Sequence, residues 1–556
     1  MHPKTPARNT ALQAFKPIAV QQKEARLNAT IQKGLDAHQR GDLTTARALY
    51  VSVLREVPTH FDALHLLGVI CSQSGEYALA IDLLSQAITV NKKHPVAHNN
   101  LGNAQTQLAK WADAVRSYDQ AIHLDPRYAL AFFNRGIALE ELHSLDAALA
   151  SYQRAIQIDP EYAQAHSNCG AVFEKIGLFN DALTHFDRAI ALDPQFAGAH
   201  YNRATHLMKH KRYDEALASF NKAIEIRPQF ADAYWNTSLT HLFRGEWAAG
   251  WDSYEWRWQR SDLGPENFRP PLDANRLAHA AITSSNLKVF IWNEQGLGDV
   301  VFHASMFSEA VARFGSVTVQ TDHRLITLLS RSIEDVVFVD KSDPVDTAHF
   351  DLHLAHGDLG FFFRRDAGDF QRIKPQYLQS DTPRAQTLRT ELRSHTELLC
   401  GITWRSNHAQ MGQAKSLRLH DLLPLFKIEG IRFINLQYGD TSNDLLEFKS
   451  NYGIEIINCL TVDNFYDIDG HAALVDACDV IITVSNSTAH IAGGLGKPTH
   501  VMLPKVNGTL WYWANRRDTQ SMWYPTVQVH EQTRNGDWDT VVSTIVTTIK
   551  EKYLNI

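Results

Sequence analysis

The stretch AFFNRGIALEELHSLDAALASYQRAIQIDP, Ala131–Pro160, decides the fold of the first half of this 556-residue chain. It predicts a pair of antiparallel helices, and its pattern returns every 34 residues from about residue 27 to about residue 260. Each pair can bury its apolar face only by stacking on the neighbouring pairs. The period therefore predicts a helical solenoid rather than a single globular core.

Small residues recur at two positions of the period. The first series is Gly34, Gly68, Gly102, Gly136, Gly170, Ala204 and Ser238. The second series, twelve positions later, is Ala46, Ala80, Ala114, Ala148, Ala182, Ala216 and Gly250. Small side chains at both positions allow the two helices of a pair to approach closely.

A third series marks the end of each period, where proline follows a helix that it cannot continue. Its members are Pro58, Lys92, Pro126, Pro160, Pro194 and Pro228, of which only Lys92 breaks the pattern. Together the three series resemble the tetratricopeptide repeat, with six good repeats and a degenerate seventh from about Ala231. The resemblance implies an α-solenoid whose concave surface is usually a peptide-binding groove.

Five asparagines stand two residues before the first small position, in strict register: Asn100, Asn134, Asn168, Asn202 and Asn236. Packing does not require them, because asparagine is a mediocre helix former. Its amide, however, offers a donor and an acceptor that match one peptide unit of an extended ligand. The arrangement resembles the asparagine ladder of O-linked N-acetylglucosamine transferases, which implies binding of an acceptor polypeptide. The alternative is a habitual residue of the repeat that caps a neighbouring turn.

Another series alternates histidine with phenylalanine and tyrosine: His98, Phe132, His166, His200 and Tyr234. Since the aromatic residues replace histidine freely, we interpret this series as one packing position per repeat and not as a set of metal ligands.

Four tryptophans lie within GEWAAGWDSYEWRWQR, Gly245–Arg260, at the end of the predicted solenoid. Tryptophan clusters can stack on bases or sugars, but these follow helical spacing, and a terminal repeat must be sealed. We therefore predict a buried joint between the two halves of the chain.

The second half changes to short apolar runs that alternate with helical patterns, which indicates parallel sheets flanked by helices. A first βαβ unit is predicted from the strand Leu287–Trp292, the helix Val300–Arg313 and the strand Val317–Gln320. A second set of strands is predicted at Cys400–Trp404, Phe433–Leu436, Glu455–Asn458, Val480–Val484 and Thr499–Leu503. The charged segment Thr382–Thr396 is predicted to contain the connection between the two sets.

The predicted fold class is thus an α-solenoid followed by an α/β part with two Rossmann-like domains. The predicted order is an N-terminal segment (1–26), the solenoid (27–262), a polar link (263–286), a first Rossmann-like domain (287–390) and a second one (391–556). Ligands of such sheets bind beyond the carboxyl ends of the strands.

Several segments of the α/β part share a further resemblance: NEQGLGDVVFHASM, GITWRSN, AKSLRL, FINLQYGD, DIDGHAALVDACDVIITVSNSTAHIAGGLGKP and SMWYP. With the repeats, they resemble bacterial proteins that join tetratricopeptide repeats to a heptosyltransferase-like, family 9-like glycosyltransferase of the GT-B fold. The resemblance implies an inverting, metal-independent transfer from a nucleotide sugar. The donor is expected mainly in the second Rossmann-like domain, and the acceptor between the two domains.

The segment after the strand Val480–Val484 is the expected donor site, because a strand that enters a helix through small polar residues presents free N–H groups to a phosphate. The expected donor contacts are Ser485, Asn486, Ser487, Thr488 and His490. Ser487 or Thr488 can equally be an ordinary helix N-cap, and His490 a satisfied helix histidine. The family usually carries an aspartate in this loop, so Ser485 and Asn486 depart from it and put heptose in doubt.

Two basic residues and an amide complete the expected donor site. Lys415 in AKSLRL matches the basic position of the family, and Arg405 follows the first strand of the same domain. Either can stabilise the departing diphosphate, or be a solvated cation. Gln437 is expected to meet the nucleoside.

An inverting transfer needs one general base to take the proton of the acceptor hydroxyl. Asp299 in GLGD is the expected base, because it stands at the start of the first helix and matches the Gly-Asp base of the family. The alternative is a helix-capping aspartate. Glu294 and His303 are reserve candidates, and His303 lies on the same helical face as Asp299.

The triplet Asp467-Ile468-Asp469 has the DxD pattern that binds metal in a different glycosyltransferase fold. Because a glycine and a helix follow it, we interpret Asp469 as an N-cap. No metal and no cofactor is expected; the nucleotide sugar is a substrate.

The composition of the chain limits which binding partners and which cellular location are expected. The net charge of −7 gives no general attraction to polyanions, so nucleic acid is not an expected partner. The five cysteines are too scattered for a disulfide scaffold or a zinc site. No run of about 18 apolar residues occurs, so no membrane span and a cytoplasmic location are expected.

Three functions follow as hypotheses. The first is a protein glycosyltransferase that modifies a Ser or Thr hydroxyl of a polypeptide held by the repeats, with flagellin as a possible target by resemblance. The second keeps the enzyme but takes a lipid-linked or free saccharide as acceptor. The third is a scaffold whose transferase-like half is inactive.

Overall fold

The structure is a computed structural model that describes residues 18–260, 286–294, 296–393, 397–407, 411–506 and 508–554. Two compact units divide the chain, residues 1–206 and 207–556. Most of the predicted link 263–286 and the first 17 residues of the predicted N-terminal segment lie outside the described residues.

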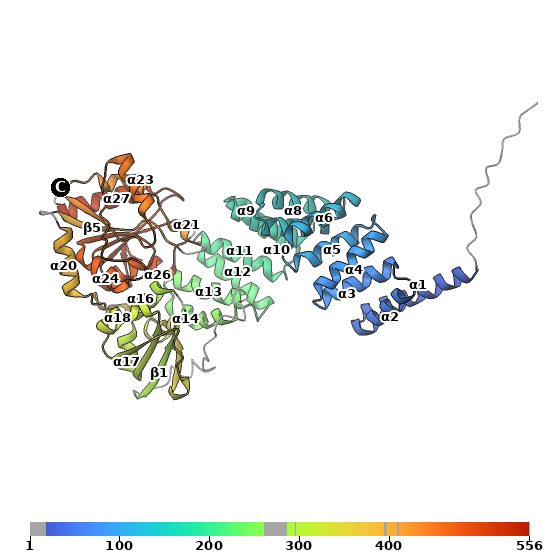
Figure 1. The fold of residues 1–556 in the computed structure, drawn as a ribbon, viewed down its shortest axis with the longest axis horizontal. Helices are drawn as coiled ribbons and strands as arrows, with labels where there is room; N and C mark the ends of the chain where they lie inside the picture. Colours follow the sequence, from blue (N-terminus) through green and yellow to red (C-terminus); the bar gives the residue numbers. More distant parts are fainter. Residues whose placement is uncertain are drawn as a thin grey trace, which may run out of the picture. The chain divides into compact units, whose positions relative to one another are not determined.

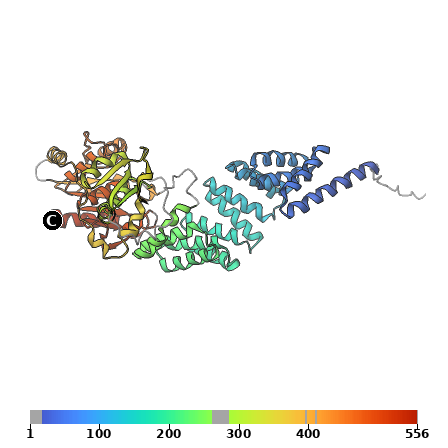
Figure 2. The ribbon, with the colours of Figure 1, turned by 90° about the horizontal axis from the view of Figure 1, so that it is seen from below.

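The predicted solenoid of paired helices is confirmed, and Figures 1 and 2 show antiparallel helix pairs that follow one another within each unit. Helices of the first unit are α1 (Ile18–Gln39), α2 (Leu43–Glu56), α3 (Phe61–Gln73), α4 (Tyr77–Val90), α5 (Pro95–Thr106), α6 (Trp111–Leu124), α7 (Ala129–Glu141), α8 (Leu145–Ile158), α9 (Ala163–Lys175) and α10 (Phe179–Leu192). Helix α11 (Ala197–Lys209) runs into the second unit, where α12 (Tyr213–Ile226), α13 (Ala231–Arg244) and α14 (Trp247–Ser253) follow.

The small residues of the repeat have the predicted packing role. A Cβ atom on Gly136 would lie only 2.5 Å from Cε1 of Tyr152, and Gly102 stands in the same relation to Tyr118. Ala148, in the second series, is fully buried. The pairs are therefore closely packed because a ring of the second helix lies directly on a glycine of the first.

The histidines of the alternating series are also structural, as predicted. Nε2 of His98 lies 3.1 Å from the carbonyl oxygen of Lys92, and Nε2 of His200 lies 3.1 Å from that of Pro194. His166 makes the same contact with Pro160 at 3.3 Å. Each ring thus satisfies a carbonyl of the turn six residues before it.

The predicted tryptophan joint is confirmed within the second unit. Trp247 and Trp251 are 4% and 3% exposed. The indole N–H of Trp251 donates to the carbonyl of Arg364 at 2.7 Å, and its ring meets Trp511 edge to face. The last repeat is consequently packed against the α/β part by buried aromatic contacts.

The first sheet is parallel, with the order β3-β2-β1-β4. Its strands are β1 (Leu287–Trp292), β2 (Gly315–Thr321), β3 (Val336–Asp340) and β4 (Leu352–Ala355). The helices that accompany them are α16 (Leu297–Ala304), α17 (Phe307–Phe314), α18 (His323–Ser332) and α19 (Leu359–Phe363). The predicted helix Val300–Arg313 is therefore two helices, and the Ser305 hydroxyl between them donates to the carbonyl of Phe302 in competition with the helix.

The second sheet has the order β6-β5-β7-β8-β11-β10-β9 and is parallel except for its β9 and β10 edge. Its strands are β5 (Leu398–Ile402), β6 (Ile431–Asn435), β7 (Val480–Val484), β8 (Thr499–Leu503), β9 (Arg516–Arg517), β10 (Gln520–Ser521) and β11 (Val527–Glu531). Its helices are α20 (Thr382–Leu392), α21 (Gly412–Lys415), α22 (Leu423–Phe426), α23 (Ser442–Tyr452), α24 (Ile468–Ala477), α25 (Ser487–Gly494), α26 (Trp511–Ala514) and α27 (Asp539–Ile549).

One expectation about this second sheet needs correction. The predicted strand Glu455–Asn458 is wrong, because the segment forms only one parallel bridge, between Ile457 and Ile434. The charged segment Thr382–Thr396 contains the helix α20, whose Arg384 pairs with Asp467 at 2.6 Å. Its charges therefore tie α20 to the second sheet.

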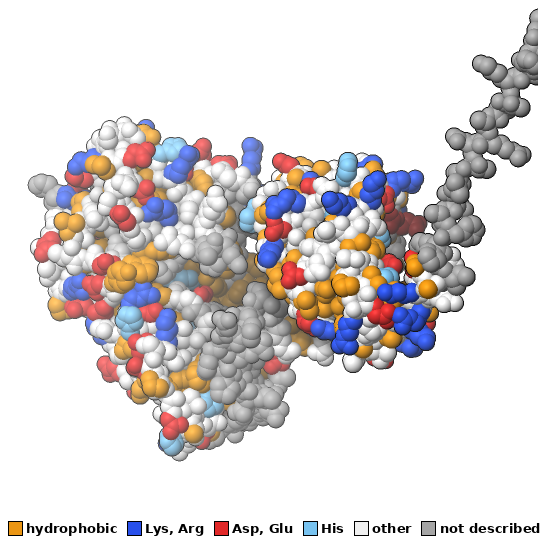
Figure 3. Space-filling view, turned by 45° about the vertical axis from the view of Figure 1, so that its right-hand side comes forward, with side chains coloured by type: hydrophobic (Ala, Val, Ile, Leu, Met, Phe, Trp, Pro, Cys, Tyr) orange, Lys and Arg blue, Asp and Glu red, His pale blue; other side chains and the backbone are white. Residues whose placement is uncertain are grey.

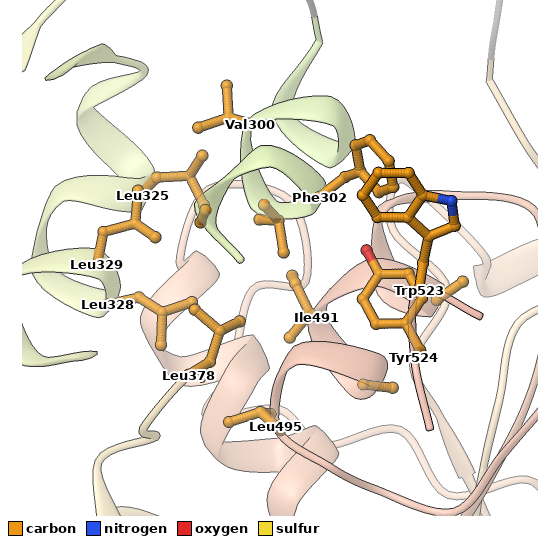
Figure 4. Packing of buried hydrophobic residues seen from close by; sticks show 14 of the residues in the cluster. Val300, Phe302, Leu325, Leu328, Leu329, Leu378, Ile491, Leu495, Trp523 and Tyr524 are labelled. Carbon is orange, nitrogen blue, oxygen red and sulfur yellow. The ribbon is translucent and has the colours of Figure 1, made fainter. Parts of the chain in front are cut away.

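The two α/β halves share a buried core. One cluster of buried hydrophobic side chains contains Val300, Leu325 and Leu328 of the first half together with Ile491 and Leu495 of the second, and Figure 4 shows part of it from close by. The phenol of Tyr377 also donates to the carbonyl of Val301 at 2.9 Å. None of the helices that the structure describes has the length and apolar composition needed to cross a bilayer.

Candidate functional site

A cavity of about 350 Å³ lies where β1 leads into α16 and β7 leads into α25. Gly298 and Asp299 line it from α16, and Ser485, Ser487 and His490 line it from the β7–α25 segment. The predicted position of the site, at the carboxyl ends of parallel strands, agrees with this cavity.

The first turns of α16 and α25 are in close contact. A Cβ atom on Gly298 would lie 3.1 Å from Cδ2 of His490 and 3.5 Å from Cα of Ser487. Glycine therefore allows two helix N-termini to meet at one cavity. Their free N–H groups and dipoles favour a bound anion.

Asn486 is the N-cap of α25, so the alternative that Ser487 or Thr488 caps this helix is wrong. Its Oδ1 accepts hydrogen bonds from the hydroxyl of Thr483 and the N–H of Ala489. Its amide nitrogen donates to the hydroxyl of Thr403 at 2.9 Å and to the carbonyl of Arg405 at 3.2 Å. A carboxylate cannot donate these last two bonds, which explains physically why asparagine stands at this position.

The hydroxyl residues beside Asn486 have different surroundings. Ser485 lines the cavity and accepts a hydrogen bond from the indole N–H of Trp513 at 3.1 Å. Ser487 lines the cavity too, whereas the buried Thr488 hydroxyl lies 3.1 Å from Nε2 of His471. Thr488, one of the expected donor contacts in this loop, therefore hydrogen-bonds in the interior and does not line the cavity.

His490 is a neutral imidazole in the cavity wall. Its Nδ1 lies 2.7 Å from the Tyr524 hydroxyl, and its ring is stacked on Trp513. Burial lowers the pKa of His490 to about 3, and the nearby charge of Lys415 acts in the same direction. A neutral ring can bind a phosphate or sugar oxygen without a change in protonation.

Asp299 and Lys415 face the same cavity from different halves of the α/β part. Burial raises the pKa of Asp299 from 3.8 to about 6, and the charge of Lys415 opposes this shift. Burial lowers the pKa of Lys415 from 10.5 to about 8, and the charge of Asp299 opposes that shift. The site thus holds a carboxyl group that titrates near neutral pH beside a desolvated ammonium group.

The reserve candidates Glu294 and His303 lie close to Asp299. Glu294 accepts hydrogen bonds from Arg257 and from the N–H of Gly357, and Arg257 also binds Asp358. Its oxygens are therefore engaged in a buried ion network. His303 is 2% exposed, and burial lowers its pKa to about 3. The backbone of Asp299 opposes this shift, but neither ring nitrogen makes a hydrogen bond of normal geometry to the described residues.

Arg405 and Gln437 are not among the residues that line the described cavity. Arg405 pairs with Asp444 at 2.8 Å. The side-chain oxygen of Gln437 accepts from the N–H groups of Trp404 and Arg405, so this amide holds the chain at the end of β5.

Arg324 is a cavity residue that the sequence patterns did not single out. It belongs to the first half, pairs with Asp322 at 2.8 Å, and donates to the carbonyl of Phe465 at 3.0 Å across the cavity. Its guanidinium lies 4.9 Å from the centre of the Phe465 ring. Its place just after strand β2 was the available signal, because ligands bind beyond strand ends.

The DxD triplet has no metal-type arrangement among the described residues. Asp467 caps α24 by accepting from the N–H of Gly470 at 2.8 Å, so the expectation that Asp469 is the N-cap is wrong. Asp469 instead pairs with Arg331 at 2.7 Å, and Asp467 pairs with Arg384. Both carboxylates are held by arginine.

The ladder asparagines of the first unit connect consecutive repeats. The amide nitrogens of Asn134 and Asn202 donate to the side chains of Asn99 and Ser167, and that of Asn100 lies 3.0 Å from Nε2 of His65. In each case the partner stands 35 residues earlier, on the preceding repeat. The expectation that packing has no need of these asparagines is therefore wrong.

All five ladder residues remain partly exposed. Asn168 differs from the other three of the first unit, because its amide nitrogen donates to the Tyr152 hydroxyl at 3.3 Å. Asn236 stands on α13, in the second unit. The bonds of the first four use the amide nitrogen, which leaves the carbonyl side of the amide as the group suited to a ligand N–H.

Family models match the helical half of the chain. A model described as "TPR repeat" matches residues 106–143 and 141–177, and one described as "Tetratricopeptide repeat" matches residues 31–96 and 172–242. The helix pairs are tetratricopeptide repeats. They end at the joint with the α/β part.

A curated relative matches a longer part of the chain. Protein FlbA of Caulobacter vibrioides is 26% identical over 339 residues, which cover 56% of this chain and 53% of that protein. The chain thus spans about half the length of this relative.

Among solved structures, the chain is similar to YrrB, described as a tetratricopeptide-repeat protein with an unusual peptide-binding site. The identity is 21%, the TM-score is 0.29, and the match covers 34% of this chain and 98% of YrrB. A tetratricopeptide-repeat protein from Parabacteroides merdae is 17% identical with a TM-score of 0.38 and covers 43% of this chain and 94% of its own.

The Asn486 network generates a first prediction. Asn486→Ala removes the helix cap and the hydrogen bonds that the amide donates to the Thr403 hydroxyl and the Arg405 carbonyl, so we expect a loss of about 2 kcal/mol or more in the free energy of unfolding. Ser487→Ala, which removes one hydroxyl from the same cavity, is the control and should change stability by less than about 0.5 kcal/mol. Chemical denaturation followed by tryptophan fluorescence measures both. Equal stability of the two variants would contradict the structural role of Asn486.

Proposed function

We propose that this protein is an inverting glycosyltransferase that transfers a sugar from a nucleotide sugar to a Ser or Thr hydroxyl of a polypeptide bound by the repeats. The observation that carries the proposal is Asp299, a carboxyl group with a raised pKa beside the buried Lys415 in one cavity. A general base with a pKa near the working pH is the most effective one.

In this proposal, the phosphate of the donor binds at the β7–α25 loop. The first-turn N–H groups of α25, the Ser487 hydroxyl and the charge of Lys415 suit a departing phosphate. The aromatic wall of Tyr438 and Phe465 suits the nucleobase. No metal ion is required by this donor set, because helix N-termini and a cation supply the positive potential.

The transfer step is a single displacement. Asp299 takes the proton of the acceptor hydroxyl as its oxygen forms a bond to the anomeric carbon of the sugar. The bond from that carbon to the phosphate oxygen breaks on the opposite face, and the nucleotide leaves with the electron pair. Lys415 and the N-terminus of α25 stabilise the negative charge that develops on it.

A protein acceptor is favoured over a saccharide by the repeats. The five ladder asparagines are partly exposed and recur once per repeat in the sequence. The four of the first unit present the carbonyl side of the amide to a ligand N–H, which suits an extended main chain of any sequence. Flagellin is the first acceptor to test by the resemblance noted above.

Asp299→Asn is the direct test of the base. The variant keeps the shape of the side chain but cannot accept the proton, so we expect transfer to fall by at least about 100-fold with donor binding retained. A panel of nucleotide sugars, screened by thermal stabilisation of the full chain, first identifies the donor. Asp343→Asn, at an exposed carboxylate of the same half, is the matched control. Unchanged turnover in Asp299→Asn would remove it from the role of base, and no stabilisation by any donor would favour a scaffold.

The pKa shifts predict a bell-shaped pH dependence of kcat/KM. Asp299 is active as a base when it is ionised, so activity rises with pH through about 6. Lys415 stabilises the leaving group when it is protonated, so activity falls through about 8. Initial rates with saturating acceptor, measured from about pH 5 to about pH 9, test this profile. A profile that is flat across this range would exclude the pair as the titrating groups.

The ladder predicts a separate effect on the acceptor. Replacing Asn100, Asn134, Asn168, Asn202 and Asn236 by alanine should raise KM for a protein acceptor by about tenfold or more, while hydrolysis of the donor is unchanged. The control replaces the exposed Asn180 and Asn221 by alanine. Because the ladder also joins repeats, circular dichroism melting must show that the variant is folded at the assay temperature. Equal loss of both activities in a folded variant would contradict the acceptor role, and an unchanged KM would favour a saccharide acceptor.

A further inference from the structure

A second cavity, of about 590 Å³, adjoins the donor cavity within the second unit. Asp299, Met411, Leu510 and Tyr512 line both cavities. A ligand in the second cavity would therefore lie next to Asp299, which also lines the cavity of the expected donor.

Aromatic and aliphatic side chains form much of the wall of this second cavity. Trp235, Leu239 and Phe243 follow one another at helical spacing along α13, in the last repeat. Phe302 and Trp511 face them from the α/β part. A cavity of this size with such a wall suits an apolar group of a ligand better than a sugar.

A buried polar group also lines this cavity. His303 is 2% exposed, and its ring nitrogens lack hydrogen bonds of normal geometry to the described residues. Buried polar groups are almost always satisfied in the functional state. A hydroxyl or peptide group of a ligand at this position would supply the missing partner.

The charges at the cavity are predominantly positive. Its basic residues are Lys209, Lys211, Arg260, Lys505 and Arg516, and its acidic residues are Asp299 and Glu531. Glu531 is already paired with Lys211 and Arg516. Lys505 is exposed, and its ammonium group donates to the carbonyl of Thr533, so it can also bind an anionic group at the mouth of the cavity. Figure 3 shows that basic and acidic side chains are mixed on the face it displays.

We infer that the second cavity binds the acceptor polypeptide through a large apolar side chain next to the acceptor Ser or Thr, together with an acidic residue that faces Lys505 at the rim. This inference rests on the proposed function. It gives the acceptor a sequence preference that the asparagine ladder, which matches any main chain, does not supply. A polypeptide is favoured over a lipid because α13 carries both the ladder residue Asn236 and the apolar wall.

The test uses the full chain without any donor. The probe is 8-anilinonaphthalene-1-sulfonate, an aromatic anion, which should bind with one fluorescent site in the second cavity. Leu239→Trp fills the cavity and should abolish this site, whereas Leu446→Trp, at a 71% exposed position of α23, should not. Lys505→Glu at the exposed rim should weaken binding, and the exposed Lys427→Glu should leave it unchanged.

Competing compounds then define the ligand. A capped nonapeptide with a central serine flanked by phenylalanine and aspartate should displace the probe. Its counterparts with alanine for phenylalanine, or lysine for aspartate, should bind about tenfold more weakly. Displacement by dodecyl phosphate but by no peptide would overturn the inference in favour of a lipid acceptor. A probe site that survives in a folded Leu239→Trp variant would overturn it as well.

These results are independent of the enzyme assay. Probe and peptide binding need neither donor nor turnover, so an inactive cavity at Asp299 leaves them unchanged. Conversely, transfer of the sugar to acceptors with no preference for the residues that flank the Ser or Thr would contradict the inference. It would leave the proposed transferase activity intact.

Discussion

The contact between the first turns of α16 and α25 is the constraint on which the site depends. Gly298 leaves room for His490 and Ser487. The N-terminus of α16, beside the first sheet, and that of α25, beside the second sheet, therefore line one cavity. The buried core between the halves maintains this contact (Figure 4). Asp299 and Lys415 then lie near each other in a desolvated place, where burial moves both pKa values towards neutrality.

Asn486 illustrates how one amide can replace a carboxylate for a structural reason. It caps α25 and also donates to two groups of the strand-end loop at Thr403 and Arg405. A carboxylate at this position would face the carbonyl of Arg405, acceptor against acceptor. Hydrogen bonding in the interior therefore explains why this loop carries asparagine where the family that the chain resembles usually carries aspartate.

Buried aromatic rings and ion pairs both join the last repeats to the α/β part. The ion pairs include Lys211 with Glu531 and Arg257 with Glu294. Trp247 and Trp251 close the last repeat, and their rings face Trp511 of the α/β part. This joint makes α13 a wall of the second cavity. The last repeat, which ends the solenoid, therefore also forms part of the cavity beside Asp299.

The sequence by itself determined the repeat, the tryptophan joint and several strands, including Val480–Val484 and Thr499–Leu503, because periodicity and burial are local patterns. It also singled out Asp299 and Lys415 as candidates. Only the tertiary structure decided that Arg324 reaches the cavity while Arg405 and Gln437 do not, and that Asn486 is the cap. Those outcomes depend on contacts between residues far apart in the chain, such as Asn486 and Thr403, which are 83 residues apart, and such contacts leave no spacing that a sequence pattern can reveal.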